Sequence, residues 1–131
     1  SSDFLEVEVH NDDITNAKVD AIINSISKTF KFSGEIAKKI IKKSGKGIQH
    51  ECIGEAQKMN LGNTLAEGTI ICTSGGESKF SNIFHIVLGT FDKRNQHTEK
   101  LIESIVFKVL TEANSKYLSS IGLSPRGRRG G

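Results

Sequence analysis

The spacing of apolar residues along this chain divides it into predicted strands and helices. Polar and apolar residues alternate over Phe4–Val9, which predicts a half-buried strand. Short apolar runs, by contrast, predict strands that are buried on both faces. These runs cover Val19–Asn24, Thr69–Thr73, Asn82–Leu88 and Ser119–Leu123. The first of them ends at the polar residue Asn24, where a loop is expected to leave the sheet.

Helical spacing of apolar residues alternates with these strands. Helices are predicted over Gly34–Ser44, Ile48–Lys58 and Thr98–Tyr117. The apolar stripe of the first is formed by Ile36, Ala37, Ile40 and Ile41, with lysines opposite. The apolar face of the last is formed by Leu101, Ile102, Ile105, Val106, Val109, Leu110, Ala113 and Tyr117. Strands that alternate with helices predict an α/β fold with a largely parallel sheet.

Loops at the carboxyl ends of such strands are the usual ligand sites of parallel sheets, particularly beside helix N-termini. Two segments of this chain have that layout, 24–36 and 123–131. The first leads directly into the predicted helix at Gly34. The sequence therefore predicts a ligand site between these two loops.

Charge changes this picture little. The 131 residues, one domain's worth, carry a net charge of +3. Arg126, Arg128 and Arg129 lie in the last six residues, and the rest of the chain is neutral. That balance argues against a broadly basic face for nucleic acid. The pairs Lys38-Lys39 and Lys42-Lys43 are interpreted as the solvated side of a helix.

Cysteine and histidine patterns predict no metal site. Cys52 and Cys72 each stand alone, and the histidines are scattered without metal-ligand spacing. Both cysteines are expected to be packed, reduced thiols, and His85, inside an apolar strand, a core histidine. The N-terminus lacks the pattern of a signal peptide, and the apolar runs are too short to span a membrane. We therefore expect an intracellular protein.

Four stretches, in order, resemble the macrodomain family. They are Asp13-Ile14-Thr15, the strand Val19–Asn24, the helix Gly34–Gly45, and the paired strands from Glu67 to Val87. The resemblance covers about residues 4–124 and implies a three-layer α/β/α fold with a mixed, largely parallel sheet. Within the family, Gly34–Gly45 and Cys72–Gly75 look closest to the tandem macrodomains of mono(ADP-ribosyl) transferases in the poly(ADP-ribose) polymerase superfamily.

The resemblance implies an ADP-ribose-binding module in the nucleus or cytoplasm, without a cofactor. Asp13 would accept a hydrogen bond from the adenine amine, assisted by the amide of Ile14. Asn24 would contact the ribose beyond the diphosphate. The diphosphate would lie between two phosphate loops formed by Ser33, Gly34, Glu35, Ile36, Ser124 and Gly127.

Plainer interpretations of the same residues remain open. From the residues alone, Asp13 could be a turn or cap residue, and Asn24 could bond to its own loop. A glycine beside a helix start, such as Gly34, is common. Phe30 and Phe32 could border the pocket or pack in the core.

Three departures from the family pattern shape the functional prediction. Ser27 and Ala37 occupy the positions of an Asn and an Asp typical of hydrolytic members, so no catalytic residue is expected. Glu35 places a negative charge beside the expected diphosphate. The resemblance also implies that a last strand, which would pair next to the first strand, and one or two helices are missing.

These departures define the predicted domain and its alternatives. Residues 1–131 would be a single incomplete macrodomain, with an Arg/Gly-rich tail over 125–131 that could be foreign. A sheet edge exposed beside the first strand could be covered by dimerisation. The leading hypothesis is a reader of ADP-ribose or ADP-ribosylated protein. The alternatives are a degenerate macrodomain with a structural or protein-interaction role, an ADP-ribosyl hydrolase, and an RNA- or poly(A)-binding module.

Overall fold

One five-stranded sheet organises the molecule, in the order β1-β5-β2-β4-β3. The computed structural model describes residues 5–88 and 96–124. The strands are β1 (Glu6–Val9), β2 (Ala21–Ile26), β3 (Ile70–Ser74), β4 (Asn82–Val87) and β5 (Ser120–Leu123). All neighbours pair in parallel except β3, which runs antiparallel to β4. The predicted mixed, largely parallel sheet is therefore confirmed.

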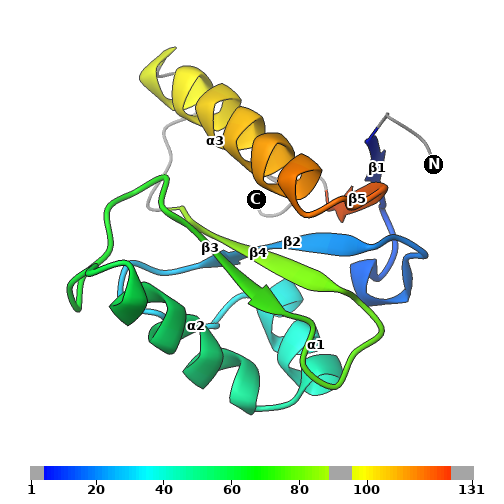
Figure 1. Ribbon diagram of the computed structural model, residues 1–131, viewed down its shortest axis with the longest axis horizontal. Coiled ribbons are helices and arrows are strands. Elements are labelled where there is room, and N and C mark those ends of the chain that lie inside the picture. The colour runs from blue at the N-terminus through cyan, green and yellow to red at the C-terminus, as the bar shows by residue number, and fades with distance from the viewer. Residues whose placement is uncertain (1–4, 89–95, 125–131) are drawn as a thin grey trace.

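Helices cover both faces of this sheet and make three layers (Figure 1). Helices α1 (Glu35–Ser44) and α2 (Gly47–Lys58) lie on one face, and α3 (Gln96–Ser115) lies on the other. A short 3-10 helix, η1 (Ile14–Asn16), follows β1. The sheet residues facing α1 and α2 include Ile22, Ile71 and Ile83, whereas Phe84 and Ile121 face α3.

The first strand pairs directly with the last described strand. Val7 lies opposite Ile121 in parallel register, and the backbone N–H of His10 donates to Leu123 O over 2.9 Å. The first strand thus has a partner, β5, in place of the strand that the resemblance implied beside it. Val7 and Val9 are 48% and 60% exposed at this edge of the sheet, so the prediction of a half-buried strand is wrong for β1, which is mostly exposed. Dimerisation through this edge stays a prediction.

Three further sequence predictions about burial and boundaries are wrong in detail. Ile36 and Val106, assigned to apolar stripes, are exposed, and Tyr117 is 92% exposed beyond the end of α3. Tyr117 has a φ of 60°, so it belongs to the turn that ends the helix. Strand β2 continues two residues past Asn24, to Ile26. Asn24 therefore lies inside the sheet.

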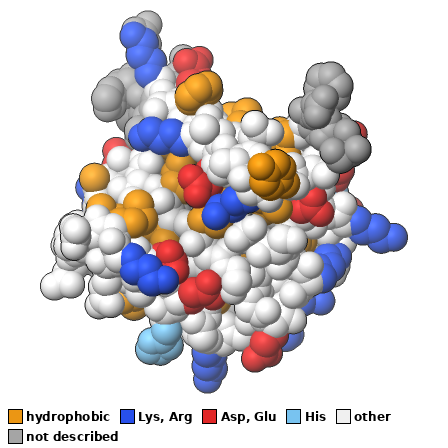
Figure 2. All heavy atoms as spheres, in the orientation of Figure 1, with side chains coloured by type: hydrophobic (Ala, Val, Ile, Leu, Met, Phe, Trp, Pro, Cys, Tyr) orange, Lys and Arg blue, Asp and Glu red, His pale blue; other side chains and the backbone are white. Residues whose placement is uncertain are grey.

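The surface carries mixed charge. Basic and acidic side chains are interspersed with hydrophobic ones on the face shown in Figure 2. On this face the described residues form no continuous basic area, which agrees with the balance of charge in the chain apart from its three tail arginines. Within residues 5–88 and 96–124, no helix is long and apolar enough to cross a membrane.

Candidate functional site

Asn24 and His85 form a polar contact in the layer between the sheet and helices α1 and α2. They are paired neighbours on the parallel strands β2 and β4, and both are almost fully buried. The side-chain amide nitrogen of Asn24 lies 3.0 Å from Nδ1 of His85. The other ring nitrogen, Nε2, lies 2.9 Å from the hydroxyl oxygen of Thr73 on β3. The predicted core histidine is confirmed, with both ring nitrogens bonded.

Burial decides the charge of His85. Desolvation lowers the pKa of its imidazole from 6.5 to about 3, because the apolar surroundings disfavour the cation. Phe32 packs against the ring, with 5.3 Å between the ring centroids. His85 is therefore neutral near pH 7 and carries one ring proton.

The side-chain oxygen of Asn24 is the exceptional atom of this cluster. It is buried and has no hydrogen-bond partner among the described residues. Such an oxygen normally costs about 1–3 kcal/mol, so one that persists requires an explanation. It lies on β2, on the side of the sheet against which α1 packs. A hydrogen-bond donor from a ligand would satisfy it.

Asp13 caps the short helix η1. One carboxylate oxygen accepts from the backbone N–H of Thr15 at 2.9 Å and from the Thr15 hydroxyl at 2.6 Å. These two bonds lower the pKa of Asp13, and Lys39 and Lys43 lower it further. The second carboxylate oxygen has no partner in the described part of the chain. The capping interpretation and the adenine-binding prediction are thus compatible, since each uses a different oxygen.

The N-terminus of α1 is open to solvent. Gly34 is the N-cap, and no side chain caps the first turn. Ser33, Glu35 and Ile36 are exposed, and a Cβ added at Gly34 would meet no atom within 4 Å. The free N–H groups and the helix dipole favour an anion here, while the exposed Glu35 carboxylate opposes one.

The end of β5 lies beside these elements. Ile22 of β2 pairs with Gly122 of β5, so Ser124 follows at the level of Asn24. Ser124 is half-buried. The predicted Gly127 and the arginines of the tail lie outside the described residues. The structure thus brings Asn24 and Ser124 to one level of the sheet, and it packs α1 against η1.

Comparison with known proteins shows to which family a chain with this arrangement belongs. The model of the Macro domain family matches residues 23–125, most of the chain. The chain belongs to the Macro domain family. This macro domain is 30% identical over 116 residues to the human protein mono-ADP-ribosyltransferase PARP14, covering 88% of the chain and 6% of that protein.

In two further comparisons the chain covers a larger share of the related protein. An uncharacterized protein of Saccharolobus solfataricus is 30% identical over 119 residues, which are 91% of the chain and 64% of that protein. A solved mutant of the Oceanobacillus iheyensis macrodomain with ADPR has a TM-score of 0.77 at 23% identity. The match covers 89% of this chain and 62% of that one. The chain therefore spans less than two thirds of each relative. The predicted family is confirmed, and the closer link to tandem macrodomains stays a prediction.

Ser27 and Ala37 have structural roles in this macro domain. The Ser27 hydroxyl accepts from the backbone N–H groups of Thr29 and Lys31, which folds the loop after β2. Ala37 is 2% exposed and packs in the core beneath α1. Neither side chain offers a carboxylate or an amide to a ligand.

The two phenylalanines of the same loop are core residues. Phe30 and Phe32 are 7% and 8% exposed and join the cluster beneath α1 and α2. Phe30 holds a φ of 65°, and its carbonyl accepts from the Gln49 side chain at 2.8 Å. The core-packing alternative is therefore confirmed for both.

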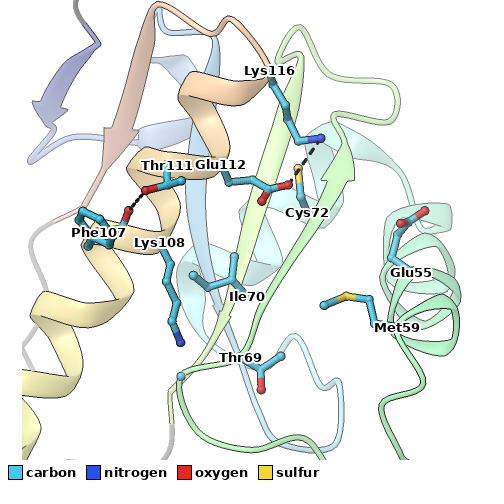
Figure 3. Close-up of a pocket in the computed structure, with 11 residues that line it drawn as sticks. Glu55, Met59, Thr69, Ile70, Cys72, Phe107, Lys108, Thr111, Glu112 and Lys116 are labelled. Carbon is cyan, nitrogen blue, oxygen red and sulfur yellow. Dashed lines mark hydrogen bonds and ion pairs between the residues drawn. The ribbon is translucent and has the colours of Figure 1, made fainter.

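A separate groove lies at the β3 edge of the sheet, the edge opposite β1 (Figure 3). It measures about 730 Å³ and is bordered by α2 and the residue that follows it, Met59, and by β3 and α3, which contribute Ile70 and Phe107. None of the described residues predicted to bind a ligand lines it. This groove was not predicted, because it depends on how α3 packs beside an edge strand.

Cys72 borders this groove, and Cys52 lies in the core. Both thiols are free, and burial raises the pKa of Cys52 to about 12 and that of Cys72 to about 11. They are therefore protonated and poorly nucleophilic near pH 7. Among the described residues, no group of three acidic, histidine or cysteine side chains could hold a metal.

Proposed function

We propose that this macro domain binds ADP-ribose, free or attached to a protein, and does not hydrolyse it. The observation that carries the proposal is the buried, unpartnered side-chain oxygen of Asn24. A ribose hydroxyl is a donor that would satisfy it. The free carboxylate oxygen of Asp13 and the open N-terminus of α1 offer an acceptor for adenine and donors for a diphosphate.

Related proteins support the same ligand. The Oceanobacillus iheyensis macrodomain has been solved with ADPR and with ADP. Because the chain spans less than two thirds of that structure, its own ligand is a proposal. Nucleus or cytoplasm is the proposed location.

Calorimetry with AMP, ADP and ADP-ribose tests the proposal. We expect affinity to rise in that order, because each ligand adds one group that this site would contact. Equal affinity for ADP and ADP-ribose would remove the role of Asn24. No heat with any of the three at millimolar concentration would reject the proposal.

The proposed lack of hydrolysis rests on Ser27 and Ala37. Neither side chain offers the amide or carboxylate expected to orient a water molecule beside the ribose, since the Ser27 hydroxyl bonds within its own loop and Ala37 lies in the core. Incubation with a mono-ADP-ribosylated protein should release no ADP-ribose beyond a no-protein control. Rapid release would make the domain a hydrolase.

A protein-interaction role is the second candidate. The groove beside β3 favours it, because Phe107 and Met59 are exposed there at 71% and 52%. Large apolar side chains gathered at one surface are common at protein interfaces. If calorimetry shows no nucleotide binding while Phe107→Ser abolishes capture of a protein partner, this second function holds.

A further inference from the structure

Three buried polar side chains form a line across three strands. Asn24 of β2 pairs with His85 of β4 in register, and Thr73 lies on the adjacent β3, two residues beyond Ile71, the residue that pairs with His85. Asn24, His85 and Thr73 are 1%, 0% and 2% exposed. Their contacts measure 3.0 Å and 2.9 Å. The line therefore connects the Asn24 amide to the far edge of the sheet without contact to water.

The donors and acceptors of this line are best satisfied by one arrangement of protons. The Thr73 hydroxyl donates its only proton to the carbonyl oxygen of Ser74 over 2.8 Å. Its oxygen must therefore accept from Nε2 of His85, which places the single ring proton on Nε2. Nδ1 is then bare and accepts from the side-chain nitrogen of Asn24. Each group has a role, and the polarity runs from Asn24 through His85 to Ser74.

The opposite polarity is chemically allowed but less satisfied. Thr73 would donate to Nε2, the ring proton would lie on Nδ1, and Asn24 would rotate to accept from it. The Ser74 carbonyl would lose the Thr73 donor, and an amide NH₂ would take the place of the free oxygen. On Asn24 itself, two unsatisfied N–H groups would replace one unsatisfied N–H group and one unsatisfied oxygen, so the lost bond to the Ser74 carbonyl is what favours the first arrangement.

We propose that Thr73 and His85 are positioning residues that hold Asn24 as a hydrogen-bond acceptor, so that the site selects a ligand group that donates. This inference rests on the proposed function. A ribose hydroxyl next to the diphosphate can donate to the Asn24 oxygen. A third phosphate in the same place presents only acceptors near neutral pH. The site therefore favours ADP-ribose over ATP, and the selection originates at Thr73, on another strand.

The tautomer of His85 gives the first arm of the test, without any ligand. In a ¹H–¹⁵N long-range correlation spectrum of the whole chain, we expect Nε2 to carry the proton and Nδ1 to be bare. Thr73→Val removes the acceptor at similar volume and should shift the ring proton to Nδ1. Thr73→Ser restores the hydroxyl and should retain the original tautomer. A proton on Nδ1 of the wild type, or no change in Thr73→Val, overturns the proposal.

The second arm measures selectivity by calorimetry with ADP-ribose and ATP. We expect Thr73→Val to lower the preference for ADP-ribose by about fivefold or more, and Thr73→Ser to retain it. Thr69→Val is the matched control, because its hydroxyl bonds only the Ala66 carbonyl, outside this line. Amide spectra establish that each variant is folded, and the tautomer of His85 in the wild type carries the test if Thr73→Val is not.

The outcomes separate this inference from the proposed function. If the wild type binds ADP-ribose and Thr73→Val changes the tautomer but not the preference, the positioning role is wrong and the proposed function stands. If the wild type binds no ADP-ribose, the proposed function fails and ligand selection fails with it. The expected result is a coupled change of tautomer and preference in Thr73→Val alone.

Discussion

The side-chain nitrogen of Asn24 donates to Nδ1 of His85 over 3.0 Å, and this single contact determines which atom of Asn24 remains free. Both residues lie with Thr73 in a largely apolar layer, where buried polar side chains are stable only if their atoms are bonded. Among the side-chain nitrogen and oxygen atoms of Asn24, His85 and Thr73, only the Asn24 oxygen has no partner in the described part of the chain. The binding account is built on that oxygen.

Asp13 should control adenine binding. Asp13→Ala removes the acceptor and should weaken ADP-ribose binding by about 1–3 kcal/mol in calorimetry. Asp13→Asn is the finer test, because its oxygen can still accept from Thr15 while its NH₂ would oppose the adenine amine. Asp12→Ala, at an exposed neighbour, is the control. Unchanged affinity in Asp13→Asn would show that adenine is not read there.

His85 should make stability depend on pH. Its pKa is about 3 in the folded chain against 6.5 in a free side chain, so the unfolded chain binds the proton more readily. The contribution of neutral His85 to the free energy of unfolding is therefore complete above about pH 6.5. It is lost as the pH falls toward 3, at up to about 1.4 kcal/mol per pH unit. Urea unfolding between pH 4 and 7 measures that slope.

Two histidine variants make this pH test specific. His85→Gln should flatten the slope, because glutamine does not titrate. His50→Gln should retain it, because His50 is exposed on α2. An equal slope in the wild type and His85→Gln would assign the pH dependence to other groups.

Glu35 should weaken the binding of a diphosphate. Its carboxylate lies in the exposed first turn of α1, where the proposed phosphates would approach. Glu35→Gln should tighten ADP-ribose binding by about 1 kcal/mol or less at low salt, with a smaller gain at high salt. Glu103→Gln, on α3, should change nothing. Tightening of equal size in both variants would indicate only an effect of net charge.

Two glycines should differ sharply in tolerance to alanine. A Cβ at Gly75 would overlap the carbonyl oxygen of Phe80, so Gly75→Ala should lower the free energy of unfolding by more than about 2 kcal/mol. Gly54 lies inside α2 with no atom within 4 Å of an added Cβ. Gly54→Ala should therefore raise the free energy of unfolding by up to about 1 kcal/mol. Urea unfolding that ranks the two variants in the opposite order would contradict this packing.

Most of the fold could be predicted from periodicity. Each predicted strand and helix is present, with boundaries shifted by one or two residues. Two errors, at Ile36 and Val106, come from the periodicity itself, because each was assigned to an apolar stripe and is exposed. Another lies where periodicity gives no information. The end of β2 was placed at Asn24, because a polar residue resembles a strand end, yet a hydrogen-bond partner on β4 keeps it inside the sheet.

The site was less accessible from the sequence than the fold. Asn24 and His85 were each singled out, but their contact depends on register between strands that are 61 residues apart. Thr73 was missed entirely. Its place near the end of the strand before His85 was a signal, but only the antiparallel turn between β3 and β4 brings its hydroxyl to the ring.

An amide NMR titration with ADP-ribose tests the central claim most directly. We predict saturable shifts at Ile14, at Glu35 and Ile36, and at the side-chain amide of Asn24, with none at Ile70 and Cys72 in the separate groove. Shifts confined to that groove, or no shifts at millimolar ADP-ribose, would contradict the account.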